Sequence, residues 1–242
     1  MFRFCPLIIA FLILSCSTDA ENILAPTLDS SIASKEVVVD NVIACAASNA
    51  DDDLISVFFY PRPSTTNFKY YETEDVSVDK NDFENYIPVE FPIRDVFNGF
   101  LKKFEVSTIN EKWVIVAFDE GGKTHLSNPI RLKQNTKPTE YLSQNVSVEA
   151  STNMPDFSWQ DGSYSDTKIY FHVVSDATNK LLSGTYTFER NFQYYNLDNV
   201  VLNVTRGTPP TLKSGSSYNF TLLGVSEDNW VNLFSEIPFQ VE

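Results

Sequence analysis

The sequence has few of the residues that usually carry catalysis. It contains only two histidines, His125 and His172, and three cysteines among 242 residues. It has no HExxH or CxxC spacing, no GxSxG motif and no glycine-rich phosphate loop. His125 is expected on a solvated hairpin and His172 at a half-exposed strand position. The sequence therefore predicts a protein that is not an enzyme and that needs no cofactor or metal.

Basic charge is also scarce. The 18 lysines and arginines are outnumbered by 32 aspartates and glutamates, which gives a net charge of -14. Nucleic acid and anionic lipid would both be repelled by such a surface, so neither is an expected partner. Only 8 residues are glycine, whereas 14% are aromatic. This composition excludes a disordered or collagenous chain and favours a β-rich globular fold.

No apolar run reaches the roughly 20 residues that a membrane-spanning helix needs. Instead, Arg3 is followed by a short apolar run at 6–14 and then by small residues, a pattern typical of a secretory signal peptide. Two cleavage sites remain open. The chain could be cut before Cys16, or after Ala20, which would release a freely soluble protein.

The sequence Leu14-Ser15-Cys16 resembles the lipobox of bacterial lipoproteins. The resemblance implies that residues 1–15 are a lipoprotein signal peptide and that Cys16 becomes the first mature residue and carries the lipid, including palmitate. Polar residues 16–27 would then form a flexible tether. The expected location is the cell envelope, as an outer-membrane lipoprotein that could also be displayed on the surface.

Cys45 has no partner for a disulfide if Cys5 is removed with the signal peptide and Cys16 is acylated. Its small apolar neighbours predict a buried strand thiol rather than a catalytic or redox group.

Short runs of β-branched and aromatic residues recur along the chain and are separated by turn formers. The strands predicted in the first half are 37–39, 42–46, 54–60, 68–72, 100–104, 113–118 and 130–132. Those predicted in the second half are 146–149, 155–159, 168–174, 184–188, 200–204, 218–225 and 238–241. Residues 79–98 fit this pattern poorly, which indicates an insertion with a short helix near 82–86.

The polar segment 133–140 is the expected boundary between two domains. Seven short strands at regular spacing on each side of it predict two β-sandwiches, at 28–134 and 139–242, and hence an all-β fold.

Several of these runs resemble fibronectin type III domains. Residues 155–159, with Trp159, are similar to strand B of that family, and residues 212–220 are similar to its approach to strand F. Tyr218 would then form a tyrosine corner, in which the phenol bonds to nearby backbone. In the first half, residues 113–118 and 127–132 resemble strands F and G, with Trp113 in place of the tyrosine. The resemblance implies tandem sandwiches of the immunoglobulin/fibronectin type III type.

An unusual concentration of aromatic residues lies between positions 159 and 195. Most of them alternate along predicted strands and are expected in the core. Phe192, Tyr194 and Tyr195 depart from that alternation, so they are predicted to lie in a loop. Exposed rings there could stack on a sugar or contact a protein.

Two acidic loops are also candidates. Asp228 and Trp230 lie in the last predicted hairpin, a position where sandwich domains often bind partners, although a structural turn is the favoured interpretation. The run Asp51-Asp52-Asp53 could offer oxygen ligands to calcium, although a solvated loop is the simpler interpretation.

The lipobox and the tandem sandwiches together resemble uncharacterised surface lipoproteins of Bacteroidota. The expected function is non-enzymatic binding of a protein or glycan partner at the envelope. The alternative is a structural or assembly subunit whose sandwiches act as spacers. A binding module should expose Phe192, Tyr194 or Trp230, whereas a spacer should bury them or present one flat, extended interface.

Overall fold

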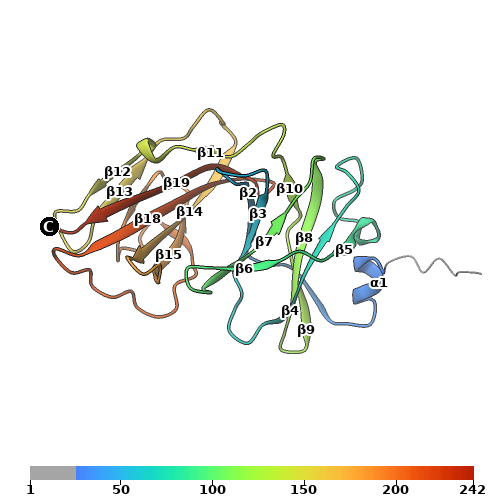
Figure 1. Ribbon diagram of the computed structural model, residues 1–242. Coiled ribbons are helices and arrows are strands. Elements are labelled where there is room, and N and C mark those ends of the chain that lie inside the picture. The colour runs from blue at the N-terminus through green and yellow to red at the C-terminus, as the bar shows by residue number, and fades with distance from the viewer. Residues whose placement is uncertain (1–25) are drawn as a thin grey trace, which may run out of the picture.

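The computed structural model describes residues 26–242 (Figure 1). The predicted signal peptide at 1–15, the lipidation of Cys16 and nearly all of the tether at 16–27 lie outside these residues. Within residues 26–242, the structure contains no helix that is long and apolar enough to span a membrane. The described chain is nearly all-β and its strands form two sandwiches, in agreement with the predicted all-β fold.

The first sandwich follows a short helix, α1 (Leu28–Ile32), whose first turn is capped by the Thr27 hydroxyl. Its strands are β1 (Val37–Val42), β2 (Ala44–Ser48), β3 (Ile55–Phe59), β4 (Thr66–Glu72), β5 (Ile87–Val89), β6 (Ile93–Val96), β7 (Leu101–Val106), β8 (Lys112–Glu120), β9 (Lys123–Ser127) and β10 (Ile130–Leu132). One sheet has the order β1-β9-β8-β4-β5, with β10 also on β8, and the other has the order β2-β3-β7-β6.

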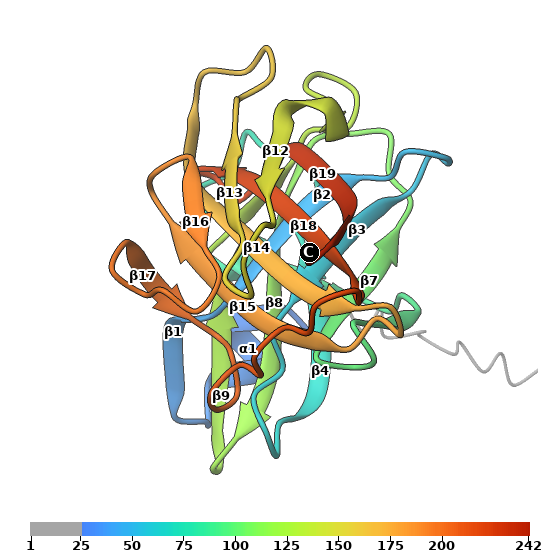
Figure 2. The same cartoon turned by 90° about the vertical axis from the view of Figure 1, so that its left-hand side faces the viewer.

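The second sandwich contains the remaining strands. They are β11 (Glu140–Tyr141), β12 (Val146–Glu149), β13 (Asp156–Trp159), β14 (Thr167–Asp176), β15 (Leu181–Thr187), β16 (Asn191–Gln193), β17 (Val200–Asn203), β18 (Ser217–Ser226) and β19 (Val231–Gln240). A small sheet with the order β12-β13-β16 packs on a large sheet with the order β11-β19-β18-β14-β15-β17 (Figure 2).

Aromatic side chains fill the core of the second sandwich. Trp159 is 2% exposed, and its ring packs edge-on against Tyr170 with the centroids 5.4 Å apart. Tyr218 accepts a hydrogen bond from the backbone N–H of Lys213 over 3.0 Å. The core tryptophan and the tyrosine corner implied by the resemblance are therefore both confirmed.

The structure differs from the sequence prediction in several short elements. β5, β6 and β9 were not predicted, and β16 forms a strand where a loop was expected. The helix expected near 82–86 is a single 3-10 turn, η1 (Phe83–Asn85), and a second such turn, η2 (Ser143–Asn145), precedes β12. Three-residue strands such as β5 and β16 are too short to show an alternating pattern.

The two sandwiches pack sheet against sheet. The β2-β3-β7-β6 sheet of the first lies next to the large sheet of the second (Figure 1). A cluster of apolar side chains from both sandwiches is buried between the sheets, which we call the joint. Its fully buried members are Cys45, Ala47, Leu101, Phe171, Val173, Leu181, Val204, Leu223, Val225 and Val231.

Candidate functional site at the joint

The hairpin between β18 and β19 inserts into the first sandwich. Trp230 is fully buried in the hydrophobic core of that sandwich. Its indole N–H donates to the Lys137 carbonyl oxygen over 2.7 Å. Asp228 pairs with Lys133, and its backbone carbonyl accepts the N–H of Arg131 over 3.0 Å. The expectation of an exposed recognition loop is therefore wrong for Trp230, and the favoured structural turn agrees with the structure, because this hairpin packs on the chain's own first sandwich.

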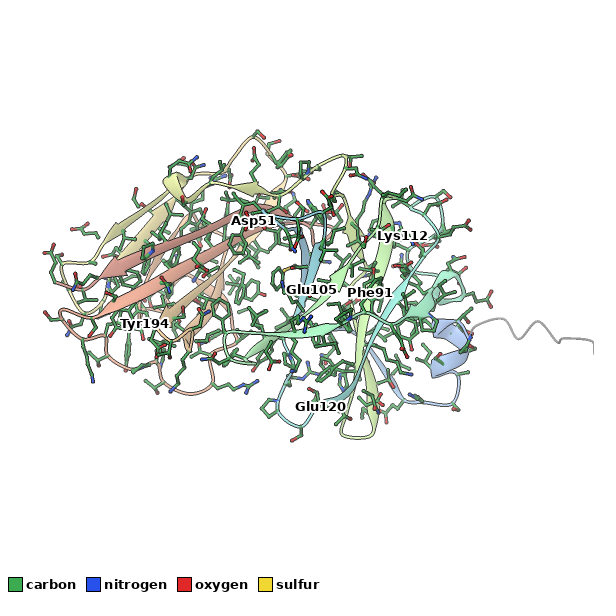
Figure 3. The ribbon with its side chains drawn as sticks, in the orientation of Figure 1. Asp51, Phe91, Glu105, Lys112, Glu120 and Tyr194 are labelled. Carbon is green, nitrogen blue, oxygen red and sulfur yellow. The ribbon has the colours of Figure 1, made fainter. Side chains whose placement is uncertain are left out.

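The second set of predicted contact residues is also mostly internal. Phe192 is 1% and Tyr194 0% exposed, because both rings close the core of the second sandwich. The Tyr194 hydroxyl donates to the Pro210 carbonyl over 2.7 Å, and Figure 3 places Tyr194 within the sandwich. Only Tyr195 is exposed, at 42%. The predicted exposure of Phe192 and Tyr194 is thus wrong.

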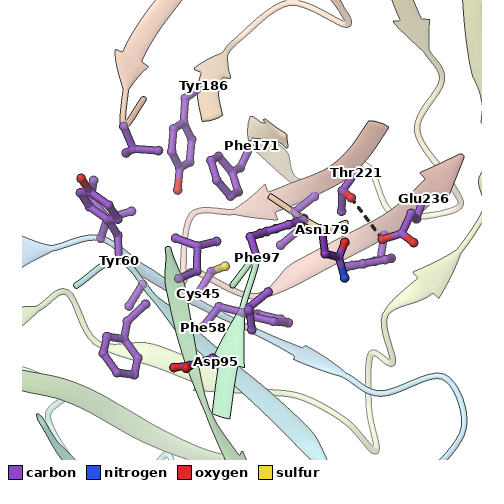
Figure 4. A pocket seen from close by; sticks show the side chains of 18 of the residues that line it. Cys45, Phe58, Tyr60, Asp95, Phe97, Phe171, Asn179, Tyr186, Thr221 and Glu236 are labelled. Carbon is purple, nitrogen blue, oxygen red and sulfur yellow. Dashed lines mark hydrogen bonds between the residues drawn. The ribbon is translucent and has the colours of Figure 1, made fainter. Parts of the chain in front are cut away.

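A half-open cavity of about 320 Å³ lies at the joint (Figure 4). Its wall is mostly aromatic and aliphatic and is contributed by both sandwiches. The aromatic members are Phe58, Phe59, Tyr60, Phe97, Phe171, Tyr186 and Phe234. A largely preformed apolar cavity with a few polar groups is the usual form of a small-ligand site.

Polar side chains at the cavity come from separate segments. Asp95, Asn98, Asn179 and Glu236 are exposed residues that line it. Asp95 accepts from the Lys102 ammonium over 2.6 Å, and Glu236 accepts from the Thr221 hydroxyl over 3.2 Å. The cavity therefore combines an apolar wall with oxygen and amide groups at its margin.

The turn between β6 and β7 places Phe97 at the cavity wall in an unusual backbone conformation. Its φ angle is 50°, and Asn98 and Gly99 follow with φ angles of 53° and 83°. Asparagine and glycine adopt this left-handed region readily, whereas a bulky side chain there is strained by roughly 1–3 kcal/mol. The packing of Phe97 against the joint must therefore offset that strain.

Two residues, Asn98 and Arg206, make polar contacts between the sandwiches beside the cavity. The Asn98 side-chain amide donates to the Thr178 carbonyl over 3.0 Å. Arg206 donates to the Pro61 carbonyl over 2.9 Å, and its guanidinium lies over the Phe100 and Tyr60 rings, 4.5 and 5.5 Å from their centroids. These contacts fix the cavity walls relative to each other.

Burial suppresses ionisation inside the cavity. It raises the pKa of the Cys45 thiol to about 12, and it raises the pKa of Tyr186 well above its usual value, with the Cys45 side chain adding to that shift. Cys45 is a free, buried strand cysteine, as predicted. Both groups are therefore neutral at physiological pH.

The two histidines are more buried than expected. His125 is 8% exposed in β9 and lies 2.7 Å from the Asn41 side-chain oxygen. His172 is 1% exposed in β14, beside Thr185 at 2.9 Å, and burial lowers its pKa to about 3. The expectations of a solvated His125 and a half-exposed His172 are therefore wrong.

Residues 51–53 form an exposed loop (Figure 3, Asp51). There, Asp52 accepts from the side chain of Asn49 and from the backbone of Leu54, each over 2.8 Å. Among residues 26–242, no group of three or more histidine, cysteine, aspartate or glutamate side chains is placed to hold a metal ion.

The cavity was not predicted because its walls come from strands far apart in the sequence. A partial signal was present in the apolar runs of β3 and β18, which break strict alternation. Such runs are typical of strands that are covered on both faces. In β18, the residues from Phe220 to Ser226 are all buried, since one face meets the sandwich core and the other meets the joint.

No protein-family model and no curated protein matches the sequence. Among solved structures, the chain is similar to the FN1–FN3 domains of chicken CNTN1, with 12% identity, a TM-score of 0.31, and coverage of 86% of this chain and 65% of that one. It is also similar to domains A168–A170 from titin, with 11% identity, a TM-score of 0.30, and coverage of 86% and 61%. The chain thus spans less than two thirds of either structure's length.

Proposed function

We propose that the protein is a non-enzymatic binding protein of the cell envelope, anchored by a lipid on Cys16, that recognises a protein or glycan partner at the cavity of the joint. The observation that carries this proposal is the cavity itself, an aromatic-lined opening of about 320 Å³ between two sandwiches that are held together. Aromatic walls suit a ring or an apolar side chain of a partner.

The contacts that join the two sandwiches support binding at this place. The insertion of Trp230 and the contacts of Asn98 and Arg206 fix both walls before any partner arrives. A preformed site avoids part of the entropy that is lost when flexible walls become ordered on binding.

Photocrosslinking in cells that express the chain tests this proposal. Asp95, which is exposed at the cavity, is replaced by p-benzoylphenylalanine, and Glu149, which is exposed on β12, is replaced in the same way as a control. We expect one envelope protein or glycan to be crosslinked from position 95 and not from position 149. Equal crosslinking from both positions, or none from 95, would exclude the cavity as the binding site.

The lipid anchor is tested separately with a palmitate analogue. We expect the analogue to label the wild type and the Cys45→Ser variant, both of which should fractionate with membranes. The Cys16→Ser variant should lose the label and the membrane association. Cleavage after Ala20 would instead give an unlabelled, soluble protein in all three cases.

A second candidate function, an assembly subunit, is favoured by one observation. β17 forms the edge of the large sheet and exposes Val201 and Leu202, at 47% and 41%. An apolar edge strand is a template for strand addition by another chain. The burial of Phe192, Tyr194 and Trp230 also agrees with what a spacer would require. If this function holds, Val201→Lys should abolish co-purification of an envelope protein, while Glu236→Gln should not.

A further inference from the structure

The charged side chains that line the cavity are all acidic. Its lining includes the carboxylates of Asp95 and Glu236 but no lysine, arginine or histidine. Asp95 is already paired with Lys102. Glu236 has no salt bridge to any residue within 26–242, and it accepts only the Thr221 hydroxyl there. Glu236 is thus a carboxylate at the cavity without a cation beside it.

We propose that the cavity selects an organic cation, an ammonium group carried on an apolar body of about two rings. This inference rests on the proposed function, in that it names the chemistry of the group that enters the same site. The cation would lie at Glu236, and the apolar body would pack among the aromatic rings.

The size of the body follows from the volume. A cavity of about 150 Å³ holds one benzene molecule. The cavity here, at about 320 Å³, is about twice as large. A fused two-ring system therefore fits, whereas a longer chain of sugars would have to remain mostly outside.

Three features favour a positive charge in the cavity. Aromatic faces attract cations, as Arg206 already shows by lying over the Phe100 and Tyr60 rings. The Tyr186 hydroxyl also points into the cavity (Figure 4), and no residue within 26–242 forms a hydrogen bond with it. Its oxygen can accept a hydrogen bond from an ammonium group. An anion would meet Glu236 in a chain whose net charge is already -14.

Three naphthalene compounds of equal size test the inference. They are naphthylmethylamine, naphthylmethanol and naphthoate, which at pH 7 are a cation, a neutral molecule and an anion. Their affinities for the purified full chain are measured by titration calorimetry. We expect the amine to bind about tenfold more tightly than the alcohol, and the carboxylate to bind most weakly.

Two matched variants locate the effect. Glu236→Gln keeps an oxygen that can accept the Thr221 hydroxyl but removes the charge, so the affinity for the amine should fall about tenfold and that for the alcohol should not change. Glu149→Gln, on exposed β12, should change neither affinity. Thermal unfolding of each variant verifies that it is folded.

The inference is overturned if none of the compounds binds, if the carboxylate binds as tightly as the amine, or if Glu236→Gln leaves the preference intact. Any of these results combined with crosslinking from position 95 would leave the proposed function standing without the cation preference. Selective amine binding without any crosslinked partner would support the cation preference and contradict the proposed function.

Discussion

The indole N–H of Trp230 donates to the carbonyl oxygen of Lys137 over 2.7 Å, and it does so inside the first sandwich although Trp230 belongs to the second. The neighbouring backbone joins the sheets as well, because the N–H of Ala46 donates to the Asn229 carbonyl over 3.0 Å. The hairpin that usually faces a partner in such domains is used here to hold the molecule together.

Trp230→Ala should therefore weaken both the first sandwich and its attachment to the second. Removing a fully buried tryptophan destabilises a protein by about 3–5 kcal/mol. We expect denaturant unfolding, followed by circular dichroism and fluorescence, to separate into two transitions.

Trp230→Phe is the matched control. It keeps most of the apolar volume but leaves the Lys137 carbonyl without its donor, so a loss of about 1–3 kcal/mol is expected, with one cooperative transition. A single unchanged transition in Trp230→Ala would contradict the role assigned to this residue.

Tyr194→Phe and Tyr195→Phe should differ although the two residues are adjacent. The Tyr194 hydroxyl bonds to the Pro210 carbonyl in a buried position, so its removal should cost about 1–2 kcal/mol. Tyr195 is exposed and should tolerate the change within about 0.5 kcal/mol. Urea denaturation of the two variants checks this, and equal losses would contradict the assigned burial.

These two tyrosines also show what the sequence could predict. The strand pattern predicted the all-β fold because aromatic residues at alternate positions are typical of β-strands. It misplaced Tyr194 because the residue lies just beyond β16, where no alternation remains, and is buried only through contacts with distant segments such as Pro210.

The candidate site was harder to predict for a similar reason. An acidic, aromatic hairpin such as the one with Trp230 has the same composition whether it faces solvent or another domain. The packing of the two sandwiches determines that outcome, and it joins residues more than 100 positions apart, such as Ala46, whose N–H donates to the Asn229 carbonyl over 3.0 Å. Those contacts leave no local periodicity in the sequence.

Cys45 should resist alkylation in the folded protein. Burial raises the pKa of its thiol to about 12, so almost no reactive thiolate exists at pH 8. In a chain with Cys5→Ser and Cys16→Ser, we expect iodoacetamide to label Cys45 rapidly in 6 M guanidinium and negligibly in buffer. Rapid labelling in buffer would mean that the joint opens readily.

His172 should make the protein less stable in mild acid. An unfolded histidine binds a proton near pH 6.5, whereas burial lowers the pKa of His172 in the folded chain to about 3. The unfolded state therefore binds more protons between these values. The free energy of unfolding should accordingly fall by up to about 1.4 kcal/mol per pH unit as the pH drops below 6.5.

The comparison with His172→Gln isolates this effect. Glutamine remains neutral and can still bond to the Thr185 hydroxyl. Between pH 6.5 and 5, the free energy of unfolding of the variant should therefore fall by about 2 kcal/mol less than that of the wild type. Carboxylates with a lowered pKa, such as that of Asp119, affect the free energy of unfolding equally in both proteins. Their effect falls mainly below pH 5. Urea denaturation at several pH values gives the two slopes, and equal slopes would mean that His172 is protonated in the folded state. The aromatic neighbours of His172 are Phe192, Trp159 and Phe220, and none of them can titrate. A difference between the two slopes is therefore assigned to His172 itself.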